Sequence, residues 1–350
     1  MPKPISHHSL KCDLKLSVLF WVLLASALPA QAITCTVPSG TTVNFGSVDV
    51  LSGIEATATA SMTVSCTAGG AEIGSNSHLC LRVGDGAAAD AQRGSRNTFV
   101  PRLLVSGTNY AGFQLYKDAG YSDFWGTFAP NSGPNRISGG RTWSSTVVYY
   151  ARLKALAPVL NGTTSIQTVA PGSYTNNFSN AGGHTQWSAT LLSGQTVDDQ
   201  CGPSIYGASG NFPFTVNATV LANCKITAPN DIDFGTQPDT ATNLQSSTNN
   251  LGIQCTRTTP YFIGLRPGNN NVNGAGVMVK GVDQVPYQLR KAAGMAAAIW
   301  GNTATSTSAG NGVAGTGTGN VIIYSIFATV PSANAPVGSY SDTVTITVNY

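Results

Sequence analysis

Residues 35–66, CTVPSGTTVNFGSVDVLSGIEATATASMTVSC, set a pattern that residues 224–255, CKITAPNDIDFGTQPDTATNLQSSTNNLGIQC, repeat. In both stretches a Phe-Gly pair begins 10 residues after the first cysteine, and a second cysteine follows 31 residues after the first. Four later motifs also recur in the same order. In the first copy they are Leu81-Arg82, Gln114-Leu115, Trp125-Gly126 and Gly172-Ser173-Tyr174. In the second copy they are Leu265-Arg266, Gln288-Leu289, Trp300-Gly301 and Gly338-Ser339-Tyr340. A self-similarity this long predicts two copies of one domain rather than a solenoid of short repeats.

The start of the chain has the features of a secretory signal peptide. Basic residues precede an apolar run, and a small-x-small cleavage motif follows it: Lys3, Lys11, Lys15, Leu16–Leu28 and Ala30-Gln31-Ala32. The apolar run is too short to span a bilayer comfortably. We therefore expect residues 1–32 to be removed from an exported chain, with one domain over residues 33–222 and a second over residues 223–350.

The cysteines of the exported chain are expected to form disulfides, because export leads to an oxidising compartment. Cleavage removes Cys12, one of the seven cysteines. The second copy then holds two cysteines, which pair with each other, and the matching pair in the first copy follows by homology. The two that remain close a bridge found only in the first copy. The predicted pairs are Cys35–Cys66, Cys80–Cys201 and Cys224–Cys255.

The composition and the residue patterns favour an all-β fold. Charged residues make up 9% of the chain, which also contains 39 glycines. Short runs of alternating apolar residues are separated by turn residues, as a β-sandwich requires. At the C-terminus the apolar side chains of Val344, Ile346, Val348 and Tyr350 alternate with polar ones. We therefore predict two β-sandwiches in tandem.

Several classes of function lack the residues that they need. The formal net charge is +3, and no cluster of Lys and Arg is present of the kind that neutralises phosphates, so no nucleic-acid partner is expected. His78 and His184 are the only histidines after residue 32. Neither lies in a recognisable catalytic motif or a full set of metal ligands. We expect no enzymatic activity, no metal and no cofactor.

The order of these motifs resembles the spore coat protein U domain family. The pattern is clearest in the second copy, which contains Ile232-Asp233-Phe234-Gly235, Cys255-Thr256, Tyr287-Gln288-Leu289, Trp300-Gly301 and Gly338-Ser339-Tyr340-Ser341-Asp342-Thr343-Val344. That family consists largely of subunits of archaic, Csu-type pili assembled by the chaperone–usher route. Two such domains in one exported chain resemble the tip adhesin of those pili.

The resemblance implies an immunoglobulin-like sandwich that lacks its last strand. A periplasmic chaperone lends a strand during export, an outer-membrane usher assembles the subunits, and a segment of the next pilin subunit replaces the chaperone's strand. This is β-augmentation of an open sheet edge. The second copy ends with the Val344–Tyr350 run, so we expect it to be incomplete and to contact its donor strand through Val344, Ile346, Val348 and Tyr350. The first copy contains the extra segments Gln186–Leu192 and Phe212–Val220, from which it can complete itself.

The position of the first cysteine favours a subunit at the pilus tip. Cleavage after Ala32 leaves only Ile33 and Thr34 before Cys35. A donor segment needs on the order of ten residues at the rise of a strand. We therefore expect a subunit that accepts a strand but donates none, reaching the cell surface at the tip after assembly in the periplasm.

Apolar loops of the first copy are the candidate surface-binding residues. The residues are Ala155, Leu156, Ala157, Pro158, Val159 and Leu160, with Leu191 and Leu192 in a second insertion. Tips of the Csu type are described as gripping surfaces through hydrophobic finger loops, which implies attachment to abiotic or host surfaces and biofilm formation. The alternative for residues 155–160 is a strand end packed inside the sandwich.

A glycan-binding tip is the second interpretation of the same chain. Trp143 and Trp187 occur only in the first copy, and aromatic faces suit sugar rings. Trp125 and Trp300 occupy matching positions and are expected in the cores. A third interpretation is a surface protein of the spore coat U type that is not a pilus tip.

Overall fold

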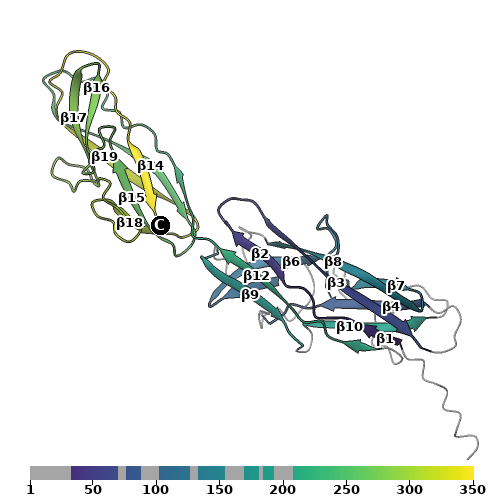
Figure 1. The fold of residues 1–350 in the computed structure, drawn as a ribbon. Coiled ribbons are helices and arrows are strands. Elements are labelled where there is room, and N and C mark those ends of the chain that lie inside the picture. Colours follow the sequence, from purple (N-terminus) through teal and green to yellow (C-terminus); the bar gives the residue numbers. More distant parts are fainter. Residues whose placement is uncertain are drawn as a thin grey trace, which may run out of the picture.

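The computed structural model describes residues 33–69, 76–87, 102–126, 133–153, 169–180, 184–192 and 208–350. Within these ranges the chain forms strands and turns and no helix. The strands build two β-sandwiches that lie end to end, the first from residues 33–220 and the second from residues 224–349 (Figure 1). The predicted fold class, two tandem sandwiches, is confirmed.

The first sandwich contains strands β1 to β12. Their bounds are β1 Ile33–Thr36, β2 Val43–Val48, β3 Ala56–Ala68, β4 Asn76–Val83, β5 Arg102–Ser106, β6 Asn109–Tyr116, β7 Asn135–Gly139, β8 Thr142–Leu153, β9 Gly172–Phe178, β10 Thr185–Leu192, β11 Ser209–Gly210 and β12 Phe214–Val220. An eight-stranded sheet has the order β1-β3-β8-β6-β5-β9-β12-β2, and a four-stranded sheet has the order β11-β10-β4-β7.

Side-chain alternation explains why these segments become strands around one core. In β3, Ala60, Met62 and Val64 are buried, whereas Ser61 and Thr63 between them are exposed. This two-residue period places the apolar side chains on one face of the sheet. Apolar side chains from both sheets meet in one buried cluster.

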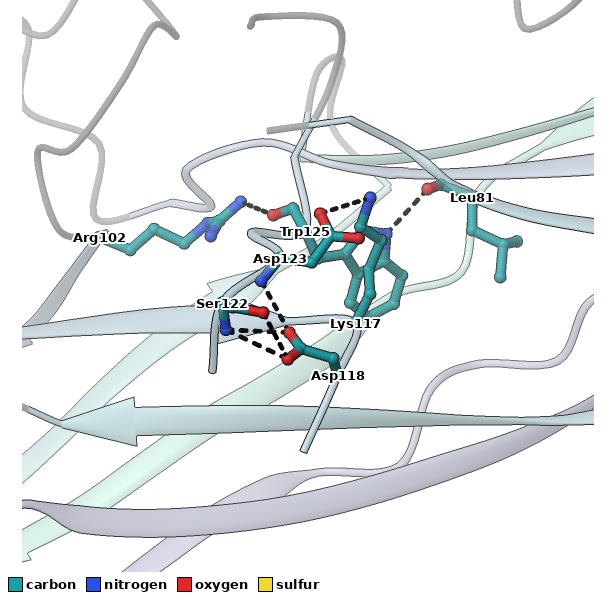
Figure 2. Close-up of polar contacts among 7 residues, drawn as sticks. All are labelled: Leu81, Arg102, Lys117, Asp118, Ser122, Asp123 and Trp125. Carbon is teal, nitrogen blue, oxygen red and sulfur yellow. Dashed lines mark hydrogen bonds and ion pairs between the residues drawn. The ribbon is translucent and has the colours of Figure 1, made fainter. Parts of the chain in front are cut away.

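Trp125 is a fixed point of that core. Its indole N–H donates to the carbonyl of Leu81 at 2.8 Å, and its own carbonyl accepts from the Arg102 guanidinium at 2.6 Å (Figure 2). Burial lowers the pKa of Arg102 to about 10, so this side chain remains charged at neutral pH. The preceding turn is held by the Asp118 carboxylate, which accepts from the Asp123 N–H at 2.7 Å. Trp125 is therefore a core residue, as the repeat predicted.

Strand β12 completes the larger sheet of the first sandwich. It pairs antiparallel with β9 and parallel with β2. Its inward side chains, Phe214, Val216, Ala218 and Val220, are all buried. The Phe214 ring stacks on Phe178 with centroids 4.5 Å apart. The first sandwich is thus closed by a strand of its own chain.

The second sandwich contains strands β13 to β20. Their bounds are β13 Cys224–Thr227, β14 Thr242–Cys255, β15 Pro260–Arg266, β16 Ala275–Lys280, β17 Asp283–Arg290, β18 Val313–Thr316, β19 Val321–Ser332 and β20 Thr345–Asn349. A five-stranded sheet has the order β13-β14-β19-β17-β16, and a three-stranded sheet has the order β18-β15-β20. Trp300 is buried in the core between them, in agreement with the prediction.

Disulfides tie the first strand of each sandwich to its neighbour. Cys35–Cys66 joins β1 to β3 and Cys224–Cys255 joins β13 to β14, each with 4.1 Å between Cα atoms. These are the pairs that the repeat predicted. Cys80 is also disulfide-bonded. Its predicted partner, Cys201, lies outside the described residues.

The two sandwiches are joined by a short segment centred on Asn223. The Asn223 side-chain amide donates to the Asp49 carboxylate of the first sandwich at 2.8 Å. Its backbone carbonyl accepts from the Thr256 N–H at 2.9 Å, and its side-chain oxygen accepts from the Tyr350 hydroxyl at 3.1 Å. One residue therefore contacts both sandwiches and the end of the last strand.

Candidate functional site: an open groove in the second sandwich

The segment after Gly338 occupies in the second sandwich the place that β9 occupies in the first. The Tyr174 hydroxyl donates to the carbonyl of Ala170 at 2.7 Å, and the Tyr340 hydroxyl donates to the carbonyl of Pro336 at 2.6 Å. Both are tyrosine corners of the immunoglobulin type. The Val105–Thr175 pairing of β5 with β9 recurs as a bridge between Val279 and Ser341. The two segments are structurally equivalent.

The next strand is present in the first sandwich and has no counterpart in the second. In the first, β12 lies between β9 and β2. Residues 223–350 are described without a gap, and no strand of theirs lies between the segment 340–344 and the segment 231–235, which corresponds to β2 through the shared Phe-Gly pair. A groove of about 700 Å³ lies there instead. Its walls and floor include Ile232, Phe234, Met278, Tyr287, Leu289, Ile326, Ala328, Tyr340, Asp342, Val344 and Ile346.

Apolar side chains in this groove are more exposed than their counterparts in the first sandwich. Ile232, Phe234, Met278 and Val344 are half-buried, packed against the core from its edge. The matching residues of the first sandwich, Val43, Phe45, Leu104 and Phe178, have exposed fractions of 0%, 8%, 0% and 0%. The difference follows from the cover that β12 gives to the first set. The groove is therefore an unfilled part of the hydrophobic core.

The four predicted contact residues of the C-terminal run divide into two groups. Val344 and Ile346 line the groove. Val348 lies on β20 opposite Ile263 of β15 and packs against the core, and Tyr350 is 48% exposed beside Asn223. Sequence reasoning missed the walls supplied by Ile232, Phe234 and Met278. The repeat could have identified these three residues, because their counterparts in the first copy surround the segment that was expected to complete the first sandwich.

A polar pair interrupts the apolar lining of the groove. The Tyr287 hydroxyl donates to the Asp342 carboxylate at 2.7 Å. Burial, with the adjacent carboxylate, raises the pKa of Tyr287, so the hydroxyl stays protonated and acts as the donor. The Gly268 N–H reaches the same carboxylate oxygen at 3.3 Å.

The predicted surface loops lie mostly outside the described residues. Ala155 to Leu160 belong to the part that is not described. Leu191 and Leu192 form the end of β10, where their backbones pair with Ser77 and Asn76 of β4. The backbone of this second candidate is therefore part of a sheet.

The tryptophans proposed as a sugar platform pack against glycines that lie in other strands. Trp187 is 8% exposed and lies directly opposite Gly210, whose missing side chain leaves room for the indole ring. Trp143 is half-buried against Gly139, and its indole N–H donates to the Ser77 hydroxyl. Trp187 in particular presents little surface for stacking on a sugar.

Neither a metal-binding cluster nor a membrane-spanning helix is found in the ranges that the structure describes. These ranges hold no group of three or more His, Cys, Asp or Glu side chains placed to bind a metal ion. None of them contains a helix with the length and hydropathy needed to cross a bilayer.

Three solved structures with a partial likeness to this chain are described as containing a tip adhesin or tip adhesion subunit. One is a complex of the chaperone CsuC with the tip adhesion subunit CsuE from archaic Csu pili of Acinetobacter baumannii, with 17% identity, a TM-score of 0.46, and coverage of 91% of this chain and 100% of that one. Another is the CupB6 tip adhesin of Pseudomonas aeruginosa, with 11% identity, a TM-score of 0.33, and coverage of 91% and 96%. A third is a chaperone–tip adhesin complex of CFA/I fimbriae, with 13% identity, a TM-score of 0.28, and coverage of 90% and 97%.

Sequence comparison identifies the family. No curated protein is similar enough in sequence to count as a match. The model of the Spore Coat Protein U domain matches residues 21–179 and again residues 211–347. The two matches together span most of the chain; the second begins before β12 of the first sandwich and extends over the second sandwich. The chain belongs to the Spore Coat Protein U domain family.

Proposed function

We propose that this chain is the adhesive tip subunit of a chaperone–usher pilus, and that its second sandwich accepts a strand from another polypeptide. The observation that carries the proposal is the groove between residues 231–235 and 340–344, at the place where β12 completes the first sandwich. An open sheet edge beside half-buried apolar side chains suits an added strand, because the strand satisfies the backbone groups and covers the side chains.

The same geometry gives each sandwich its own role. During export, directed by residues 1–32, a periplasmic chaperone fills the groove, and the outer-membrane usher then exchanges it for a segment of the next pilin subunit. The first sandwich needs no such partner because β12 already closes it. It is therefore free to face outward at the cell surface.

Strand capture by the groove tests the proposal directly. A synthetic peptide with the sequence of residues 209–222 reproduces the β12 strand, and we expect it to bind the full-length protein. The expected change is a gain in thermal stability that rises with peptide concentration. Calorimetric titration and melting curves measure both effects.

Two variants of the same hairpin separate groove binding from adventitious binding. Met278→Lys places a charge in the groove floor and is expected to abolish peptide binding. Val282→Lys, at a side chain that is 94% exposed between β16 and β17, is the matched control and should bind like the parent. Equal binding by both variants would show that the peptide does not enter the groove.

We propose in addition that the first sandwich attaches to surfaces through apolar residues, chiefly Ala155–Leu160 and secondly Leu191 and Leu192 at the end of β10, and that this attachment supports biofilm formation. Burial of apolar area contributes about 25 cal/mol per Å². A few aliphatic side chains on each tip, multiplied over many pili, give strong attachment through multivalency.

Binding of the full-length protein to polystyrene checks this surface hypothesis. Replacing Ala157, Val159 and Leu160 together by serine is expected to reduce bound protein at least about tenfold, because the apolar contact area is removed. The melting temperature of the variant serves as the folding control. Retention of plastic binding by a folded variant would exclude this loop.

A glycan-binding tip is the alternative function. It predicts competition by one specific glycan from a panel and no effect of the serine substitutions. Trp187 packs against Gly210 and exposes little of its ring, which favours the surface hypothesis over this one. A surface protein of the spore coat U type that forms no pilus would bind neither the chaperone nor the strand peptide.

A further inference from the structure

The two copies differ at one buried polar position beside the completing strand. Gln114-Leu115 and Gln288-Leu289 are shared landmarks, so Phe113 corresponds to Tyr287. The shared Gly-Ser-Tyr motif likewise makes Asn176 the counterpart of Asp342. The first copy therefore has a phenyl ring and an amide where the second has a phenol and a carboxylate.

The amide of the first copy is satisfied without help from β12. Asn176 is 1% exposed, and its side-chain NH₂ donates to the carbonyls of Asp85 at 2.8 Å and Leu103 at 2.9 Å. The β12 residue directly opposite Asn176 is Val216, which is fully buried. An aliphatic residue is acceptable there because the amide donors already have partners.

The carboxylate of the second copy is not satisfied in the same way. One oxygen of Asp342 accepts from the Tyr287 hydroxyl at 2.7 Å and the Gly268 N–H at 3.3 Å. Among the described residues, the other oxygen accepts from the Thr343 N–H alone, at 2.8 Å. An ionised carboxylate can accept about four hydrogen bonds, so this second oxygen retains a free lone pair.

The position of the phenol is fixed by a glycine in the neighbouring strand. Tyr287 lies directly opposite Gly276, and a Cβ added to Gly276 would lie 2.1 Å from the Cζ atom of the ring. In the first copy the residue opposite Phe113 is Arg102, whose guanidinium binds backbone carbonyls of β4 and Trp125. The second copy has thus exchanged a buried cation for a glycine that lets the Tyr287 ring lie across it toward Asp342.

An incoming strand must desolvate this carboxylate. Asp342 is half-buried while the groove is open, and its counterpart Asn176 is almost completely buried under β12. A buried carboxylate with an unpaired oxygen is strongly unfavourable, and a hydrogen-bond donor on the strand removes that penalty. An aliphatic side chain in the position of Val216 leaves the penalty in place.

We infer that Asp342 selects the strand that fills the groove, an inference that rests on the proposed function. The strand of the partner polypeptide runs antiparallel to residues 340–344, with apolar side chains facing inward at the positions of Phe214 and Ala218. Between them, opposite Asp342, it presents a small side chain that donates a hydrogen bond: serine, threonine or asparagine. The groove thereby discriminates against a strand such as β12, whose inward-facing side chains are all apolar.

Peptides that differ by one isosteric substitution test this selection. The parent peptide copies residues 209–222, and the second peptide carries the change Val216→Thr, which replaces a methyl group by a hydroxyl of similar size. Titrated into the full-length protein, the threonine peptide is expected to bind at least about tenfold more tightly, since hydrogen bonds to charged groups are the stronger class. A third peptide with Val216→Asp is expected not to bind, because two carboxylates would meet.

Variants of the protein assign the preference to Asp342. Asp342→Asn recreates the residue of the first copy and is expected to remove the preference for threonine. Tyr287→Phe withdraws one donor from the carboxylate, and the preference is expected to persist or to grow. Failure of every peptide to bind would overturn the proposed function, whereas equal binding of the parent and threonine peptides would overturn only the selection by Asp342.

Discussion

Attaching a completing strand to the end of the chain is expected to raise the melting temperature of the second sandwich by about 10 to 15 °C. The tail consists of a flexible linker after Tyr350 and a copy of residues 209–222 with threonine in place of Val216. A tethered segment has an effective concentration of about 1 mM, and a dissociation constant of about 1 µM then stabilises the fold by about 4 kcal/mol. The half-buried side chains of Ile232, Phe234, Met278 and Val344 become covered, as their counterparts are in the first sandwich.

Scanning calorimetry of the full-length protein with and without the tail measures this shift. A tail with aspartate in place of both Val216 and Ala218 has the same length and is the matched control, because it cannot enter an apolar groove. The tailed protein should also stop binding the free peptide. An unchanged melting temperature, together with undiminished peptide binding, would mean that the tail does not occupy the groove.

The second large effect is expected from Phe214→Ala in β12. The Phe214 ring stacks on Phe178 with centroids 4.5 Å apart and packs against Tyr149 with centroids 5.8 Å apart. Truncation of a buried aromatic side chain costs about 3 to 5 kcal/mol. We expect the first sandwich to lose that amount of stability and the second to remain unchanged.

Phe234→Ala is the natural comparison for this variant. Phe234 lies at the edge of the open groove and is half-buried, so its truncation removes less packing and is expected to cost less than half as much. Chemical denaturation followed by tryptophan fluorescence monitors the first sandwich through Trp125, Trp143 and Trp187 and the second through Trp300. A smaller loss for Phe214→Ala than for Phe234→Ala would contradict the assignment of β12 as the completing strand.

The repeat made much of this architecture predictable. Local patterns define the sandwich class, and the matching cysteine spacing identifies Cys35–Cys66 and Cys224–Cys255 as disulfides. The extra segment Phe212–Val220 was expected to complete the first copy, and it supplies β12. These inferences succeed because they depend on residue periodicity and on a comparison of the chain with itself.

The composition of the groove was harder to predict because it depends on strand register. Val344, Ile346 and Val348 form one alternating run in the sequence, yet β20 begins at Thr345 and joins β15 in the opposite sheet. The run therefore divides between the groove wall and the core. The Tyr287–Asp342 contact joins residues that are far apart in the sequence. Both residues belong to motifs that were quoted for the family resemblance, so no local pattern singled out their contact.

The parallel pairing of β12 with β2 also bears on how the protein withstands mechanical load. β12 ends at Val220, three residues before the Asn223 junction, so tension between the two sandwiches enters the first one along the axis of this strand. Backbone hydrogen bonds to β9 and β2 flank it on both sides and lie across the direction of pull. Such bonds are loaded together in shear rather than opened one after another. The strand that completes the first fold is thus also the element that anchors it against tension applied through the second sandwich.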